Sequence, residues 1–141
     1  MKDAHDLQRF VEAQGAGGTY EQALTELRVG RKQSHWMWFV FPQVAGLGRS
    51  AMAQRYAIAS LDEARAYLAH PVLGPRLQES TAALLEADGS AEAILGSTDA
   101  MKLRSSMTLF AAAAPDQPLF TDALDRFFGG EADAATTSQL G

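Results

Sequence analysis

The chain has 141 residues, of which 47% are hydrophobic and 21% charged, and it carries a formal net charge of −5 with no cysteine. We expect one globular domain over residues 1–141, without disulfides or thiolate metal sites. The acidic balance argues against nucleic acid as a partner. No signal region is seen at the N-terminus, and no apolar run approaches the roughly 20 residues of a membrane span. We therefore expect a cytoplasmic protein with no membrane partner.

Two amphipathic helices separated by glycines are the first elements in chain order. Apolar residues at helical spacing follow Asp6, and the GAGG stretch at residues 15–18 ends that helix. The next four residues, TYEQ at 19–22, have the form of a capping box and predict a second helix. This second helix should end at Gly30, where a C-terminal capping glycine is expected.

An aromatic segment at residues 36–41, WMWFVF, comes next and has no polar position. Its composition is typical of a strand, but no other segment offers a pairing partner. As a short helix it would be apolar on both faces, so it must be surrounded by other elements. Pro42 then ends it. We interpret the segment as the central element of the core, helical or irregular.

Caps, glycines and prolines divide the rest of the chain into short helical segments. They are expected at residues 50–59, 60–70, about 75–88, 97–114 and 118–128, with a short turn at 91–95. The tail from about residue 130 is small and polar, and we expect it to be flexible. The fold is therefore predicted to be all-α, a compact bundle of about seven helices around a central aromatic segment.

Three stretches also resemble a known family. They are GRKQSHWMWFVFPQVAGLGRSAMAQRYAI, EARAYLAHPVLGPRL and KLRSSMTLF, and the chain's ends, DLQRFVEAQ and FFGGEADAATT, resemble the family's ends. The family is bacterial and fungal and is known only as domain of unknown function number eighteen-ten. The resemblance implies a compact helical domain with no established activity. Some members are labelled calpastatin-like, but an acidic globular helical chain does not fit a disordered protease inhibitor.

The first candidate site precedes the aromatic segment and contains Arg31, Lys32, Ser34 and His35. Basic groups beside an apolar wall suggest a pocket for an anion. Alternatively, the two basic residues only complement the end of the preceding helix, where cations are favoured. His35 is expected to be half-buried, either as a hydrogen-bonded structural residue or as a general acid or base.

The second candidate site is the loop after the aromatic segment, with Gln43, Gly46, Gly48, Arg49 and Ser50. Two glycines allow backbone N–H groups to converge on an anion, and an arginine can bind a phosphate with two hydrogen bonds. The stretch is no Walker motif. The alternative is that each glycine simply makes a turn.

The third candidate site is one face of the helix at residues 97–114, where Lys102, Ser105 and Ser106 are spaced by three and four residues. A serine and a lysine at this spacing suggest a ligand contact or a nucleophile with its base. The alternative is that the small serines allow close helix packing while the lysine reaches solvent. We favour packing for Ser106 and leave Lys102 and Ser105 open.

These segments lead to two hypotheses. In the first, the three sites surround one pocket for a small anionic or nucleotide-like molecule, with Trp36 or Trp38 stacking a planar group. His35 and Lys102 are then the candidate catalytic residues, and whether turnover occurs stays open. In the second, the aromatic segment is only core or interface in a protein-interaction or homodimerisation module. No metal or cofactor motif is present.

Overall fold

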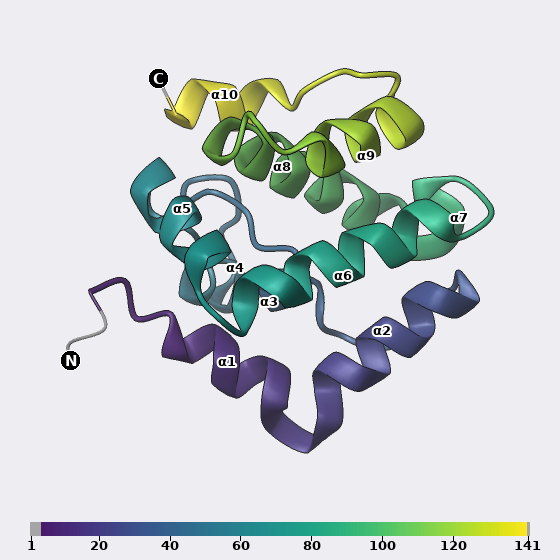
Figure 1. Cartoon of the computed structure of the whole chain (residues 1–141), viewed down its shortest axis with the longest axis horizontal. Helices are drawn as coiled ribbons and strands as arrows, with labels where there is room; N and C mark the ends of the chain where they lie inside the picture. Colours follow the sequence, from purple (N-terminus) through teal and green to yellow (C-terminus); the bar gives the residue numbers. More distant parts are fainter. Residues whose placement is uncertain (1–3, 141) are drawn as a thin grey trace.

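The computed structural model describes residues 4–140, which are helical apart from loops and one isolated β-bridge between Val44 and Ile58 (Figure 1). The expected all-α fold is confirmed, and the number of helices in this range roughly matches the seven that the sequence predicted. No helix in this part of the chain is long and apolar enough to cross a membrane. The helices are α1 (Gln8–Gly15), α2 (Thr19–Val29), α3 (Met37–Val40), α4 (Ala51–Arg55), α5 (Leu61–Ala69), α6 (Leu73–Glu86), α7 (Ala91–Leu95), α8 (Ser97–Ala113), α9 (Pro118–Phe128) and α10 (Ala134–Leu140), with a 3-10 turn, η1 (Ala16–Gly18), between α1 and α2.

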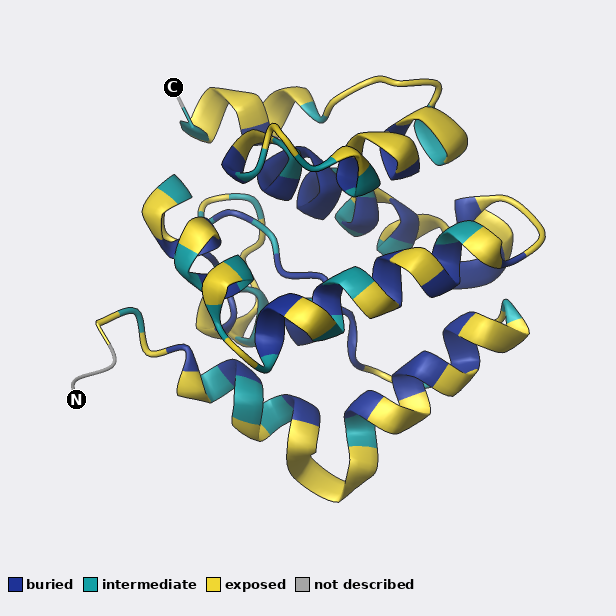
Figure 2. Ribbon diagram, in the orientation of Figure 1, coloured by how far each residue is buried: buried dark blue, intermediate teal, exposed yellow. Residues whose placement is uncertain are grey.

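Helix α8 lies at the centre of the fold and packs against α5, α7, α9 and α10. Figure 2 shows that α8 is largely buried. Its large buried side chains include Leu103, Met107 and Phe110. Helix α6 contacts α2, α5 and α9, and α1 and α2 form a V joined by η1 (Figure 1). The central aromatic segment becomes α3, with Trp36 and Phe41 completely buried on either side of it.

Local signals explain some helix ends and fail at others. Ser60 caps α5 through a hydrogen bond from the backbone N–H of Glu63 to its hydroxyl oxygen. Thr19, by contrast, does not cap α2, because Gly18 occupies the cap position. The helix expected at residues 50–59 ends at Arg55, since the chain then turns to place Ile58 beside Val44.

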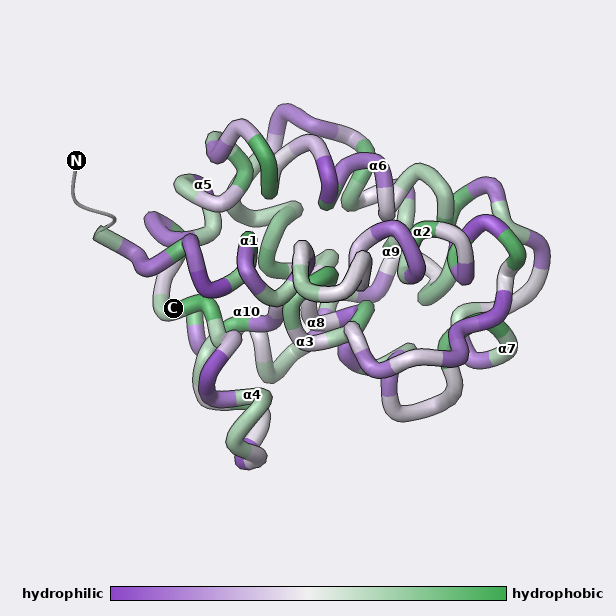
Figure 3. Tube along the Cα trace, turned by 90° about the horizontal axis from the view of Figure 1, so that it is seen from below, coloured by the Kyte–Doolittle hydropathy of each residue, from purple (hydrophilic) through white to green (hydrophobic). Residues whose placement is uncertain are grey.

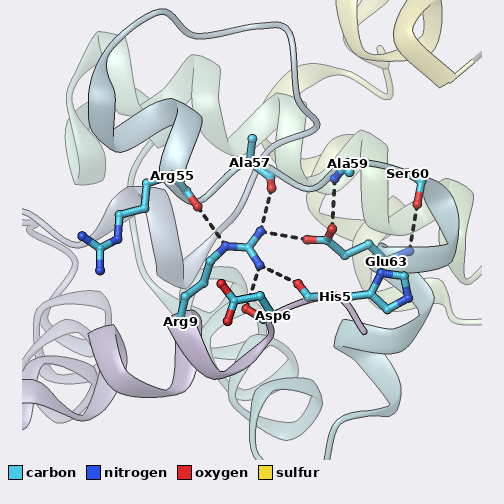
Figure 4. Close-up of polar contacts among 8 residues, drawn as sticks. All are labelled: His5, Asp6, Arg9, Arg55, Ala57, Ala59, Ser60 and Glu63. Carbon is cyan, nitrogen blue, oxygen red and sulfur yellow. Dashed lines mark hydrogen bonds and ion pairs between the residues drawn. The ribbon is translucent and has the colours of Figure 1, made fainter. Parts of the chain in front are cut away.

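Arg9 ties the start of α1 to the segment between α4 and α5 (Figure 4). Its guanidinium lies 2.9 Å from a carboxylate oxygen of Glu63, and both side chains are largely buried. It also donates to four backbone carbonyls, those of His5, Asp6, Arg55 and Ala57. A planar group with five N–H donors is suited to such a site. Arg9 therefore fixes the segment that returns from α4 towards the core.

Candidate functional site

A cavity of about 460 Å³ lies between α3, the loop before α4, α8 and the start of α10. Its walls combine apolar side chains with cationic and polar ones. The lining residues are Trp38, Gln43, Leu47, Gly48, Arg49, Ser50, Ala53, Thr98, Met101, Lys102, Ser105, Asp133 and Ala135. From the three candidate sites it therefore brings together Trp38, Gln43, Gly48, Arg49, Ser50, Lys102 and Ser105.

The residues just before the aromatic segment do not line this cavity. Arg31 and His35 are exposed, so the expected half-burial of His35 is wrong. The side chains of Ser34 and Trp36 are instead turned towards Glu26 on α2. Gly46, in the next loop, also lies outside the cavity lining.

Glu26 is a buried carboxylate that holds the chain entering α3. Its Oε1 accepts hydrogen bonds from the backbone N–H groups of Gln33 and Ser34 and, at 2.9 Å, from the indole of Trp36. Its Oε2 accepts from the hydroxyl of Ser34 and the amide of Gln22. Burial alone would raise the pKa of this carboxyl, but the hydrogen bonds outweigh burial and lower the pKa to about 2. Glu26 is therefore a charged structural anchor.

Two lysines share one carboxylate beside the cavity. The ammonium of Lys32 lies 2.9 Å from Oδ2 of Asp99, and that of Lys102 lies 3.2 Å from Oδ1. Each lysine also lies over a tryptophan ring, Lys32 over Trp36 at 5.1 Å and Lys102 over Trp38 at 4.7 Å from ammonium to ring centroid. The side chains of Lys32, Asp99 and Lys102 are only 9%, 17% and 22% exposed. These three residues form a charge cluster, which therefore has one net positive charge and little exposure to solvent.

The loop glycines have structural explanations of their own. Gly46 adopts φ of +97°, a conformation that side chains rarely allow. A Cβ atom on Gly48 would lie 2.5 Å from Cβ of Ala53, so only glycine fits this close approach. Ser50 caps α4 by accepting a hydrogen bond from the backbone of Ala53. Arg49 is exposed on the cavity lining, and Figure 3 shows α4 projecting from the rest of the fold.

Asp133 is a cavity residue that the sequence analysis did not single out. It precedes α10, and its Oδ2 accepts hydrogen bonds from the backbone N–H and the hydroxyl of Thr136 at 2.9 and 2.6 Å. The hydroxyl of Ser105 donates to the same oxygen at 3.3 Å. Aspartate is a favoured residue at a helix start, and this signal was hidden here in a stretch of small polar residues. The tail therefore contains a helix whose start contributes to the cavity.

Comparison with known proteins gives a family and a fold. Residues 4–140 match the model of a family described as Protein of unknown function (DUF1810). The structure is similar to the crystal structure of the conserved hypothetical protein Rv1873 from Mycobacterium tuberculosis, with a TM-score of 0.94 and 50% sequence identity over 98% of both chains. No curated protein matches the chain. Neither description names an activity or a ligand.

Proposed function

The chain belongs to the DUF1810 family, whose function is unknown, and from the charges around its cavity we propose that it binds a small anionic molecule there. The proposal extends to a cytoplasmic location, which the absence of cysteine suits. Nucleotides and phosphorylated metabolites are the ligand class that we expect.

One observation carries this proposal, the unbalanced charge of the cluster formed by Lys32, Asp99 and Lys102. Placing a charge away from water is costly unless an opposite charge accompanies it. Asp99 can neutralise only one of its two lysine partners. An anion in the cavity would neutralise the second, at Lys102. Arg49, which lines the same cavity, adds another cation to receive it.

The apolar lining favours a ligand that has an apolar part as well as a charged group. Leu47, Met101 and Ala135 line the cavity, and the side chain of Met101 is 73% exposed, as expected for a residue at the rim. Trp36 is fully buried, so Trp38 is the tryptophan that can contact a planar group. The ammonium of Lys102 already lies over its ring. A planar group of the ligand would therefore contact the part of the Trp38 ring that Lys102 does not cover, or the apolar side chains at the rim of the cavity.

The proposal is for binding, and it gives Lys102 the role of holding the anion. Lys102 is held beside the cavity by its ion pair with Asp99, which suits it to hold an anion. His35 is exposed and outside the cavity lining, so it is not included in the binding site. The single hydroxyl proton of Ser105 is within reach of Asp133 and of the backbone carbonyl of Met101, which suits a positioning role better than that of a nucleophile.

Titration calorimetry with adenosine monophosphate and with inorganic phosphate would test the proposal. We expect binding to the wild type and a loss of at least about tenfold in Arg49→Gln and Lys102→Gln, because each removes a cation from the cavity. Arg31→Gln is the matched control, since Arg31 is an exposed arginine outside the cavity lining. Equal weakening in all three variants would indicate a nonspecific charge effect. No binding by the wild type would favour the interaction or homodimerisation module, which sedimentation would then examine.

A further inference from the structure

Asp133, at the start of α10, is a carboxylate that forms no ion pair with any residue of the described range 4–140. Asp133 lines the cavity together with Lys102 and Arg49. Within residues 4–140, the hydrogen bonds to its carboxylate come from Ser105 and Thr136, and all of them end on Oδ2. Oδ1 is therefore the oxygen that remains to accept a hydrogen bond from a bound molecule.

This carboxylate is held in place by the chain around it. The backbone N–H of Asp133 donates to the hydroxyl of Thr108 on α8 at 2.9 Å. Arg104, also on α8, donates to the backbone carbonyls of Glu131 and Ala132 at 3.0 and 3.1 Å. Thr136, one turn into α10, is fully buried. An acceptor fixed in this way loses little conformational entropy when it binds a ligand, so it can contribute to selectivity.

The acceptor and the cation lie beside α8 at different levels of the helix. The ammonium of Lys102 reaches back along the helix to Asp99, and Ser105 lies three residues after Lys102 on the same face. Asp133 is hydrogen-bonded to Ser105 and so lies at the second of these two positions. The cavity is therefore positive towards the start of α8 and negative towards Ser105 and the start of α10. Binding sites and their ligands have complementary charge, so a polar pattern of this kind indicates a ligand with the opposite pattern.

We infer that the ligand carries an anionic group and, at its other end, an ammonium or hydroxyl group that donates a hydrogen bond to Oδ1 of Asp133. The ligand class is then a small phosphorylated amine or polyol, and a simple alkyl phosphate would be a poor ligand. This inference rests on the proposed function, because it assumes that the anionic group is held at Lys102 and Arg49.

Two isosteric probes test the inference, O-phosphoethanolamine and n-propyl phosphate. They differ only in that an ammonium group replaces a methyl group. We expect the wild type to bind O-phosphoethanolamine about tenfold more tightly, as measured by ligand-observed NMR titration. Asp133→Asn should abolish this preference, because its oxygen must still cap α10 and its amide then presents donors to the cavity. Asp122→Asn is the matched control, since Asp122 is an exposed aspartate outside the cavity lining and its loss should keep the preference.

The outcomes separate this inference from the proposed function. Equal affinity of the wild type for both probes, lost in Lys102→Gln, would overturn the inference and leave the anion site standing. A preference that survives in a folded Asp133→Asn protein would overturn the assignment to Asp133. If neither probe binds the wild type, both the inference and the proposed anion site are overturned. Melting curves of each variant establish that the compared proteins are folded.

Discussion

Replacing Glu26 by glutamine should make the protein less stable at neutral pH and less sensitive to acid. The wild-type carboxylate is buried and accepts hydrogen bonds from Gln22, Gln33, Ser34 and Trp36. Glutamine would keep one acceptor oxygen and point an NH2 group at donors. The variant should therefore lose the stabilisation that the charged form receives from its partners.

The magnitude follows from the pKa of this carboxyl, which falls from 4.5 to about 2 on folding. A difference of this size corresponds to about 3 kcal/mol of unfolding free energy, at 1.36 kcal/mol per pKa unit. Because the folded pKa is lowered, the contribution is complete above the unfolded value of 4.5 and is lost as pH falls towards 2. Linkage predicts that about 2 kcal/mol of it is lost by roughly pH 3.

Urea unfolding of the wild type and Glu26→Gln at about pH 6 and pH 3 measures this contribution. Glu21→Gln is the matched control, because Glu21 is exposed on the same helix and changes the charge equally. The wild type should be more stable than Glu26→Gln by about 3 kcal/mol at pH 6, and this gap should narrow by about 2 kcal/mol at pH 3. A gap that is the same at both pH values would refute the reasoning, since it would mean that Glu26 titrates alike in the folded and unfolded chain.

Three further predictions concern charge and packing. Lys32→Met should weaken phosphate binding severalfold in calorimetry although Lys32 lies outside the cavity lining, because the change removes a positive charge. Asp99→Asn should strengthen phosphate binding, because it leaves more net positive charge beside the cavity. Weaker binding by both variants would indicate that the cluster is purely structural. Arg9→Ala should lower the unfolding free energy in urea by about 2–4 kcal/mol, because it leaves a buried carboxylate without its cation, and an effect below about 1 kcal/mol would contradict this. Gly74→Ala should cost about 1–3 kcal/mol, since its Cβ would lie 2.1 Å from a backbone carbonyl oxygen, whereas Gly15→Ala has nothing within 4 Å and should be neutral or slightly stabilising in melting curves.

Sequence patterns located the elements around the cavity but could not assign the roles of individual side chains. The segment at residues 36–41 is apolar on both faces, so periodicity could not tell which tryptophan would meet the cavity. The choice is made by Glu26 on a different helix, which binds the indole N–H of Trp36 and leaves Trp38 at the cavity. Local patterns contain no information about such a contact.

The charge cluster was unpredictable for a related reason. Lys32 and Asp99 are far apart in the sequence, and their pairing depends on how α8 packs against the chain that follows α2. A lysine after a helix end is already explained by the helix dipole, so nothing in the sequence indicated that Lys32 also pairs with Asp99. Asp133 was hidden in the same way, because small residues and glycines around it resemble a flexible tail.

The different surroundings of the two tryptophans give this protein a spectroscopic reference of its own. Trp36 is fully buried and hydrogen-bonded to Glu26, whereas Trp38 is partly exposed at the cavity. Emission from Trp38 should respond to an occupant of the cavity, while emission from Trp36 should change only when the core opens. Single Trp→Phe variants would thus separate occupancy from unfolding by fluorescence, with no added dye.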